Sequence, residues 1–138
     1  MSSVERRGAP PGDRRNIDTG ALLQLAAAAA SEVKPSSLIH LDLRGICTFT
    51  DHFLIAGASS VRQVRAIAER IEERLSGEQV RLFHREGDQE SGWILLDYSD
   101  FIVHIFEETT RVYYDLEGLW ADAPKQELVR SASQGPLR

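Results

Sequence analysis

The most regular alternation of apolar and polar positions falls between residues 61 and 77. The apolar side chains recur there at spacings of three and four, which places them on one helical face, and charged side chains fill the opposite face. Ser59 and Ser60 precede the segment as candidate caps, Gly77 ends it, and Arg65 and Glu69 form an i,i+4 pair. The pattern predicts an amphipathic helix whose apolar face consists of Val61, Val64, Ile67, Ala68, Ile71 and Leu75.

An alanine-rich stretch predicts an earlier helix over residues 19–33. Alanine has the highest helix propensity, and Asp18 or Thr19 can cap the first turn. Lys34-Pro35 ends the segment, because proline disfavours helical geometry in the residue before it.

Five short apolar segments are predicted as strands. Residues 38–43 alternate between apolar and polar side chains in part, and residues 52–57 form a continuous apolar run that is typical of a central strand. The other candidates are residues 80–84, 93–98 and 101–106, and the Ser99-Asp100 turn between the last two favours an antiparallel hairpin.

The remaining segments complete the expected order of elements. Residues 86–92 are expected to form an acidic loop, and residues 107–118 a final short helix. The order predicts an α/β fold, a single domain with a mixed sheet of about five strands flanked by helices. We assign this domain to residues 17–123, with flexible Ser-, Gly-, Pro- and Arg-containing tails at residues 1–16 and 124–138.

The net charge of −5 is unevenly distributed. Residues 17–123 contain nine Lys or Arg against eighteen Asp or Glu, which gives −9, whereas each tail carries +2. A phosphate backbone would repel this acidic domain, so we expect no direct nucleic-acid binding; a basic protein is the better electrostatic match. Maintenance of solubility is the alternative explanation of the acidity.

No motif of an enzyme or a metal site stands out. Gly57 to Ser60 lacks the lysine of a phosphate-binding loop, so the serines are expected to act as caps. Ser60 lacks the G-x-S-x-G elbow of a hydrolase, and Cys47 is expected to pack as a small apolar residue. No HExxH or DxD spacing links the other candidates, which are Asp51, His52, His84, Asp97, Asp100 and His104. We therefore expect no metal, no cofactor and no catalytic residue.

The same sequence indicates a cytoplasmic location. The N-terminus lacks the apolar region of a secretory signal, the longest apolar run is about half of a membrane span, and the single cysteine suits a reducing compartment. Trp93 and Trp120 remain as aromatic side chains that serve either as anchors in an interface or as core residues.

Seven short blocks of sequence carry a family resemblance. They are Leu41-Asp-Leu, Thr50-Asp51-His-Phe-Leu-Ile-Ala-Gly57, Ser59-Ser60-x-Arg62-Gln63-Val64, Arg85-Glu86-Gly87, Gly92-Trp93-Ile-Leu-Leu-Asp97-Tyr-x-Asp100, Val103-His104-Ile-Phe and Tyr114-x-Leu116-x-x-Leu119-Trp120. In this order and spacing, over nearly all of residues 19–120, the chain resembles the ribosomal silencing factor family, also called iojap-like.

The resemblance implies a translational repressor. Members of that family bind ribosomal protein fourteen of the large subunit on the face that meets the small subunit, and so block subunit joining without any turnover. It also implies a nucleotidyltransferase-like topology. The sequence lacks the paired carboxylates of such an enzyme, because Asp97 and Asp100 flank a turn and would not point together from one strand.

These expectations place the partner-binding residues on the predicted hairpin and at the exit of the last helix. They are Trp93, Asp100, Val103, Tyr114, Leu119 and Trp120. We also expect a homodimer in the absence of the target, because a large aromatic patch is seldom left exposed on a monomer. The alternatives are a nucleotidyltransferase-like enzyme or nucleotide-binding protein that uses Gly57 to Ser60, and an RNA contact through the N-terminal arginines.

Overall fold

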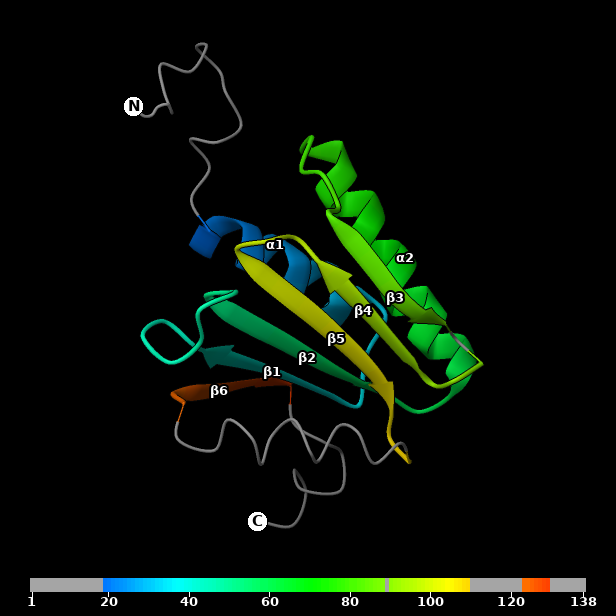
Figure 1. The fold of residues 1–138 in the computed structure, drawn as a ribbon. Helices are drawn as coiled ribbons and strands as arrows, with labels where there is room; N and C mark the ends of the chain where they lie inside the picture. Colours follow the sequence, from blue (N-terminus) through cyan, green and yellow to red (C-terminus); the bar gives the residue numbers. More distant parts are fainter. Residues whose placement is uncertain (1–18, 89, 110–122, 130–138) are drawn as a thin grey trace.

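Six strands form one mixed sheet in the part of the chain that the computed structural model describes, residues 19–88, 90–109 and 123–129 (Figure 1). The strand order is β3-β4-β5-β2-β1-β6, with β2 parallel to β5 and every other pair antiparallel. The elements are α1 (Thr19–Glu32), β1 (Ser37–Asp42), β2 (His52–Ala58), α2 (Val61–Gly77), β3 (His84–Asp88), β4 (Trp93–Asp97), β5 (Phe101–Glu107) and β6 (Lys125–Val129). The predicted α/β class and mixed sheet are confirmed, with six strands in place of about five.

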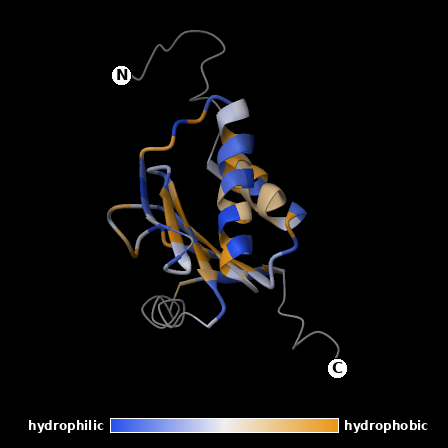
Figure 2. Ribbon diagram, turned by 90° about the vertical axis from the view of Figure 1, so that its right-hand side faces the viewer, coloured by the Kyte–Doolittle hydropathy of each residue, from blue (hydrophilic) through white to orange (hydrophobic). Residues whose placement is uncertain are grey.

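The amphipathic helix α2 forms as its sequence predicts, except that Val61, at its first position, is exposed and does not belong to the buried face. The Ser60 side chain accepts a hydrogen bond from the Gln63 N–H, which satisfies one of the free donors of the first turn. Arg65 donates to Glu69 at 2.8 Å, and the helix ends at Gly77. Figure 2 shows that α2 carries polar residues along one side and that the sheet beneath is mostly apolar.

Helices α1 and α2 lie side by side against one face of the sheet and are joined at their ends (Figures 1 and 2). The Gln63 amide nitrogen donates to the carbonyl oxygens of Val33 and Lys34 at 3.0 and 2.9 Å, just beyond the end of α1. Glu32 receives Arg70 and, at 2.5 Å, Arg74. Gln63 thus ties the start of α2 to the end of α1, and Arg70 and Arg74 tie its middle and last turn to the same end.

The strands bury apolar side chains on both faces. The helix-covered face includes Leu38, Leu54, Ala56, Ile94, Leu96, Val103 and Ile105, and the opposite face Ile39, Leu41, Phe53, Ile55, Ile102 and Phe106. All seven residues of β2 are buried, which confirms the predicted central strand. Cys47 is half-buried against the second group, as expected of a packing residue.

Three predicted boundaries were wrong. The third strand runs over His84–Asp88, not residues 80–84, so that part of the expected acidic loop is strand. Residues 125–129, placed in a tail by the sequence analysis, form the edge strand β6. Glu107 ends β5 instead of starting a helix, and the rest of the predicted helix, from residue 110 on, lies outside the described residues.

Candidate partner-binding surface

The centre of the candidate surface is a pair of stacked aromatic rings. Trp93 opens β4 directly opposite Phe106 in β5, and their ring centroids lie 6.3 Å apart with an angle of 16° between the planes. Phe106 is fully buried, whereas Trp93 is only half-buried. Phe106 therefore supports one side of the Trp93 ring, and the tryptophan as a whole stays partly accessible, although within the described structure its Nε1 is buried without a hydrogen-bond partner.

Gly87 allows the indole to take this position. Its backbone has a φ of 80°, a conformation that side chains rarely adopt, in the β3 strand beside Trp93. A Cβ at this position would lie 2.2 Å from the Trp93 carbonyl oxygen and 3.1 Å from its ring. Any other residue at position 87 would push β3 away from the tryptophan.

His104 extends the aromatic row into the sheet. Its ring stacks on Phe106 at 5.9 Å and meets the edge of Phe53 at 4.5 Å. Burial lowers the pKa of His104 to about 4, so the ring is neutral at pH 7. Within the described structure, neither ring nitrogen has a hydrogen-bond partner, which makes His104 a side chain of the aromatic row and not an acid or base exposed to solvent.

Carboxylates flank the aromatic row. Directly paired residues of antiparallel strands share a face, so Asp88 lies on the face of Trp93 and Glu86 on the face of Leu95. Both carboxylates are exposed. Alternation along β3 directs Arg85 to the helix side, where it binds Glu72 of α2. The accessible indole is therefore bordered by negative charge.

The structure does not gather the six predicted partner-binding residues in one place. Trp93 and Asp100 lie at opposite ends of the β4–β5 hairpin, because Asp100 belongs to its turn and Trp93 pairs with the far end of β5. The Asp100 carboxylate accepts from the Thr19 hydroxyl at 3.4 Å. Val103 is fully buried beneath the helices, on the face opposite to Trp93. Tyr114, Leu119 and Trp120 lie outside the described residues.

The turn before α2 uses its polar groups internally. Gln63 Oε1 accepts from the Ser59 backbone N–H at 2.6 Å and from its hydroxyl at 3.0 Å, and Ser60 caps the helix. Asp97 accepts from the Ser99 N–H at 2.7 Å, within the hairpin turn. Within the described ranges, no three His, Cys, Asp or Glu side chains lie close enough together to hold a metal ion.

One pair of polar residues escaped the sequence analysis. The ring nitrogens His40 Nε2 and His52 Nδ1 lie 2.9 Å apart on the helix-covered face. The available signal was alternation: His40 occupies the same phase of β1 as Leu38, which makes it a polar residue on a face that is otherwise apolar.

None of the described helices is long and apolar enough to cross a membrane.

Comparison with known proteins identifies the family. The family model described as "Ribosomal silencing factor during starvation" matches residues 16–136. The chain belongs to the ribosomal silencing factor family. Its members take their name from silencing of the ribosome, and the resemblance found in the sequence is confirmed.

Individual relatives agree with this assignment. The ribosomal silencing factor RsfS of Bacillus subtilis is 38% identical over 107 residues, 78% of this chain and 91% of that protein. The RsfS of Chromobacterium violaceum is 32% identical over 97 residues, 70% of this chain and 80% of that protein. The chloroplastic protein Iojap of Zea mays is 35% identical over 130 residues, which cover 91% of this chain and 56% of the maize protein.

Solved structures have the same fold. A crystal structure from Bacillus halodurans has a TM-score of 0.71 and 35% identity, covering 80% of this chain and all of that one. An X-ray structure from Chromobacterium violaceum has a TM-score of 0.72 and 28% identity, covering 84% and 97% of the two chains. The ribosomal silencing factor matches both over most of its length.

Proposed function

We propose that this ribosomal silencing factor is a translational repressor that binds ribosomal protein fourteen of the large subunit and sterically blocks joining of the small subunit. Its action is stoichiometric: each bound copy removes one large subunit from translation, with no reaction to catalyse. Such a role takes place in the cytoplasm, where the subunits meet.

The observation that supports this proposal is the half-buried Trp93 ring on Phe106, bordered by Glu86 and Asp88. A rigid aromatic side chain in a supported position is the usual anchor of an interface, because it buries a large area at little cost in conformational entropy. Ribosomal proteins are basic, and the carboxylates would mainly accelerate and orient their approach. We therefore place the contact on Trp93 and its acidic border, without the side chain of Val103.

The enzyme alternative has less support from the same geometry. A nucleotide phosphate at Gly57 to Ser60 would need free backbone N–H groups, yet Gln63 accepts from that of Ser59 and Ser60 accepts from that of Gln63. Asp97 ends β4 and Asp100 belongs to the hairpin turn, and Asp97 is engaged by the Ser99 N–H. These engaged backbone and carboxylate groups do not favour nucleotide transfer, whereas binding of a protein through Trp93 does not require them.

The test is a subunit-joining assay with purified large and small subunits. The wild-type chain should co-sediment with large subunits and reduce the light scattering of joined ribosomes. Glu86→Lys should slow association at low salt, by about tenfold or less, because long-range attraction is lost. The matched control is Glu73→Lys on α2, which makes the same charge change on the other side of the sheet and should have a much smaller effect.

Three outcomes would contradict the proposal. They are failure to bind large subunits at low salt, binding without inhibition of joining, and equal effects of the two lysine substitutions. Stabilisation of the chain by ATP and Mg²⁺ in thermal unfolding would favour the enzyme alternative, because a ligand that binds only the native state must raise stability.

A further inference from the structure

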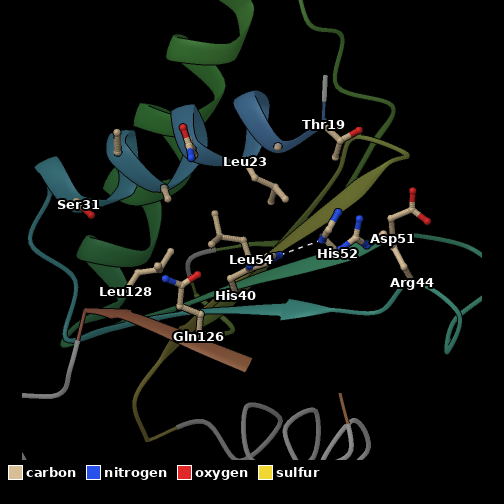
Figure 3. Close-up of a pocket in the computed structure, with 14 residues that line it drawn as sticks. Thr19, Leu23, Ser31, His40, Arg44, Asp51, His52, Leu54, Gln126 and Leu128 are labelled. Atoms are coloured by element: carbon tan, nitrogen blue, oxygen red, sulfur yellow. Dashed lines mark hydrogen bonds between the residues drawn. The ribbon is translucent and has the colours of Figure 1, made fainter. Parts of the chain in front are cut away.

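A cavity of about 780 Å³ lies between α1 and the strands β1, β2 and β6, on the sheet face opposite to Trp93 (Figure 3). Small side chains on the cavity side of α1 leave this space open, including Gly20, Ala27, Ala28 and Ser31. The floor is formed by His40, His52 and Leu54, and the edge strand β6 contributes Gln126 and Leu128. The volume is that of a small-molecule site.

The histidine pair gives the floor a fixed hydrogen-bonding character. With Nε2 of His40 and Nδ1 of His52 bonded to each other at 2.9 Å, each ring keeps one other nitrogen. A neutral imidazole has one donor and one acceptor, so the pair always offers one donor and one acceptor at its outer nitrogens, whichever tautomer is present. Burial is the first cause that lowers the pKa of both histidines, which keeps the pair neutral at pH 7.

The charge around the pair is negative in balance. Asp42 holds Arg44 through two hydrogen bonds, at 2.9 and 2.6 Å, so this guanidinium is already neutralised. Asp51 lines the cavity beside Arg44, and Asp100 lies close enough to act on His52 and to accept from Thr19. Asp42, Asp51 and Asp100 thus outnumber the one guanidinium at this end. Figure 3 shows Asp51, Arg44 and His52 together there.

The other end of the cavity is mainly aliphatic, with Gln126 and Ser31 as its polar side chains. Leu128 of β6, Leu54 of β2 and the alanines of α1 form its walls, away from Asp51 (Figure 3). A ligand that satisfies both ends needs a positive, donor-rich head and an aliphatic body. A carboxylate or phosphate head would meet Asp51 and neutral histidines, and no unpaired cation among the lining residues would offset that repulsion.

We infer that this cavity is a binding site for a small organic cation, a primary ammonium group on an aliphatic body. The ammonium donates to the Asp51 carboxylate and to the acceptor nitrogen of the His40–His52 pair, and the aliphatic body lies against Leu54 and Leu128. The site goes beyond ribosome silencing, and it lies on the opposite face of the sheet from Trp93.

Three probes that share one aliphatic body test the charge preference with the full-length chain. Hexylammonium, hexanol and hexanoate are titrated at pH 7.5 while the ring signals of His40 and His52 are followed by NMR. Hexylammonium should bind in about the millimolar range, at least about tenfold tighter than the other two, because only its head pairs with Asp51. Equal or tighter binding of hexanoate, or no shift with hexylammonium up to about 10 mM, would overturn the inference.

Two variants locate the site. Asp51→Asn should weaken hexylammonium binding about tenfold, and the matched control Glu73→Gln on α2 should leave it unchanged. Ala28→Phe replaces a small side chain of the cavity wall on α1 by a bulky ring that fills the cavity. This variant should abolish binding of hexylammonium. Unchanged affinity in both Asp51→Asn and Ala28→Phe would overturn the assignment. Both variants should still inhibit subunit joining, so this inference and the proposed function fail independently.

Discussion

Trp93 and Phe106 face each other across two antiparallel strands, with their ring planes 16° apart, and only the tryptophan is partly accessible. The Trp93 side chain can therefore contribute both to folding stability and to partner binding. The indole packs on Phe106 with its Nε1 buried, and the accessible part of the tryptophan is available to a partner.

Trp93→Ala should therefore affect binding more than folding. We expect affinity for large subunits to fall by about 2 kcal/mol or more, roughly thirtyfold, since anchoring tryptophans dominate interfaces. Folding stability should fall by less than the about 3–5 kcal/mol typical of a fully buried tryptophan. Thermal unfolding and co-sedimentation of the same variant measure both effects. A destabilised variant that binds normally while folded would place the interface elsewhere.

Gly87→Ala should destabilise the protein and disturb the indole. The positive φ and the contact with the Trp93 carbonyl both oppose a side chain, so we expect a loss of about 1–3 kcal/mol. Gly77→Ala is the matched control, because a Cβ there meets nothing within 4 Å and the helix gains propensity. Urea denaturation with tryptophan fluorescence compares the two. Similar stabilities of the two variants would contradict this role of Gly87.

Gln63→Ala should loosen the junction between the two helices. The side chain donates to Val33 and Lys34 and accepts from Ser59, so its removal leaves several backbone groups without partners, at a cost of about 1–3 kcal/mol. Gln63→Glu keeps the acceptor for Ser59 but loses the donors. We expect an intermediate stability in chemical denaturation, and hydrogen exchange at residues 33–36 should rise in both variants. An Arg62→Ala control should change neither measurement.

The buried His104 should make stability fall in acid. Its pKa is about 4 in the folded chain and about 6.5 when unfolded, so between these values only the unfolded state binds the proton. The contribution of His104 to the free energy of unfolding is constant above about pH 6.5. Between about pH 6.5 and pH 4 it falls by at most about 1.4 kcal/mol per pH unit. His104→Phe should gain about 2–3 kcal/mol relative to wild type between pH 7.5 and 4.5. The histidines of the cavity are present in both proteins, so their effect cancels; parallel pH profiles would contradict the prediction.

We expect the free protein to form a dimer through the Trp93 surface. A partly accessible tryptophan beside half-buried Leu95 is a patch that a second copy can cover. Light scattering should give a mass that rises with concentration in the micromolar range, and Trp93→Ala should shift it to the monomer. A constant monomeric mass in the wild type would count against the dimer.

The sequence predicted those elements whose pattern has a single explanation. Helix α2 has a regular apolar face, a cap and a stop, and the central strand β2 is apolar after His52. The edge strands gave no such signal. Every residue of β3 is exposed, so its place depends on backbone pairing with β4, whereas the apolar stretch before it ends in Phe83, which is 72% exposed.

The site was harder to predict than the fold for a related reason. The segment Phe101 to Phe106 is apolar but for His104, so its sequence does not reveal which face each side chain takes, and Val103 was assigned to the surface. The hairpin itself was predicted correctly and already separates Trp93 from Asp100. The His40–His52 contact joins side chains of the neighbouring strands β1 and β2. It depends on the register of their pairing, which alternation alone does not fix.

The pairing of β6 with β1 predicts an order of folding. Leu41 pairs with Lys125, 84 residues later, and closing so long a loop costs entropy that only the finished contacts repay. The β1–β2 hairpin and the packing of α2 form from shorter-range contacts and should precede it. Until β6 docks, β1 presents an open edge on which a strand of another copy can pair. We therefore expect the last step of folding to be a competition between closure within one molecule and strand exchange between two, in which dilution favours closure.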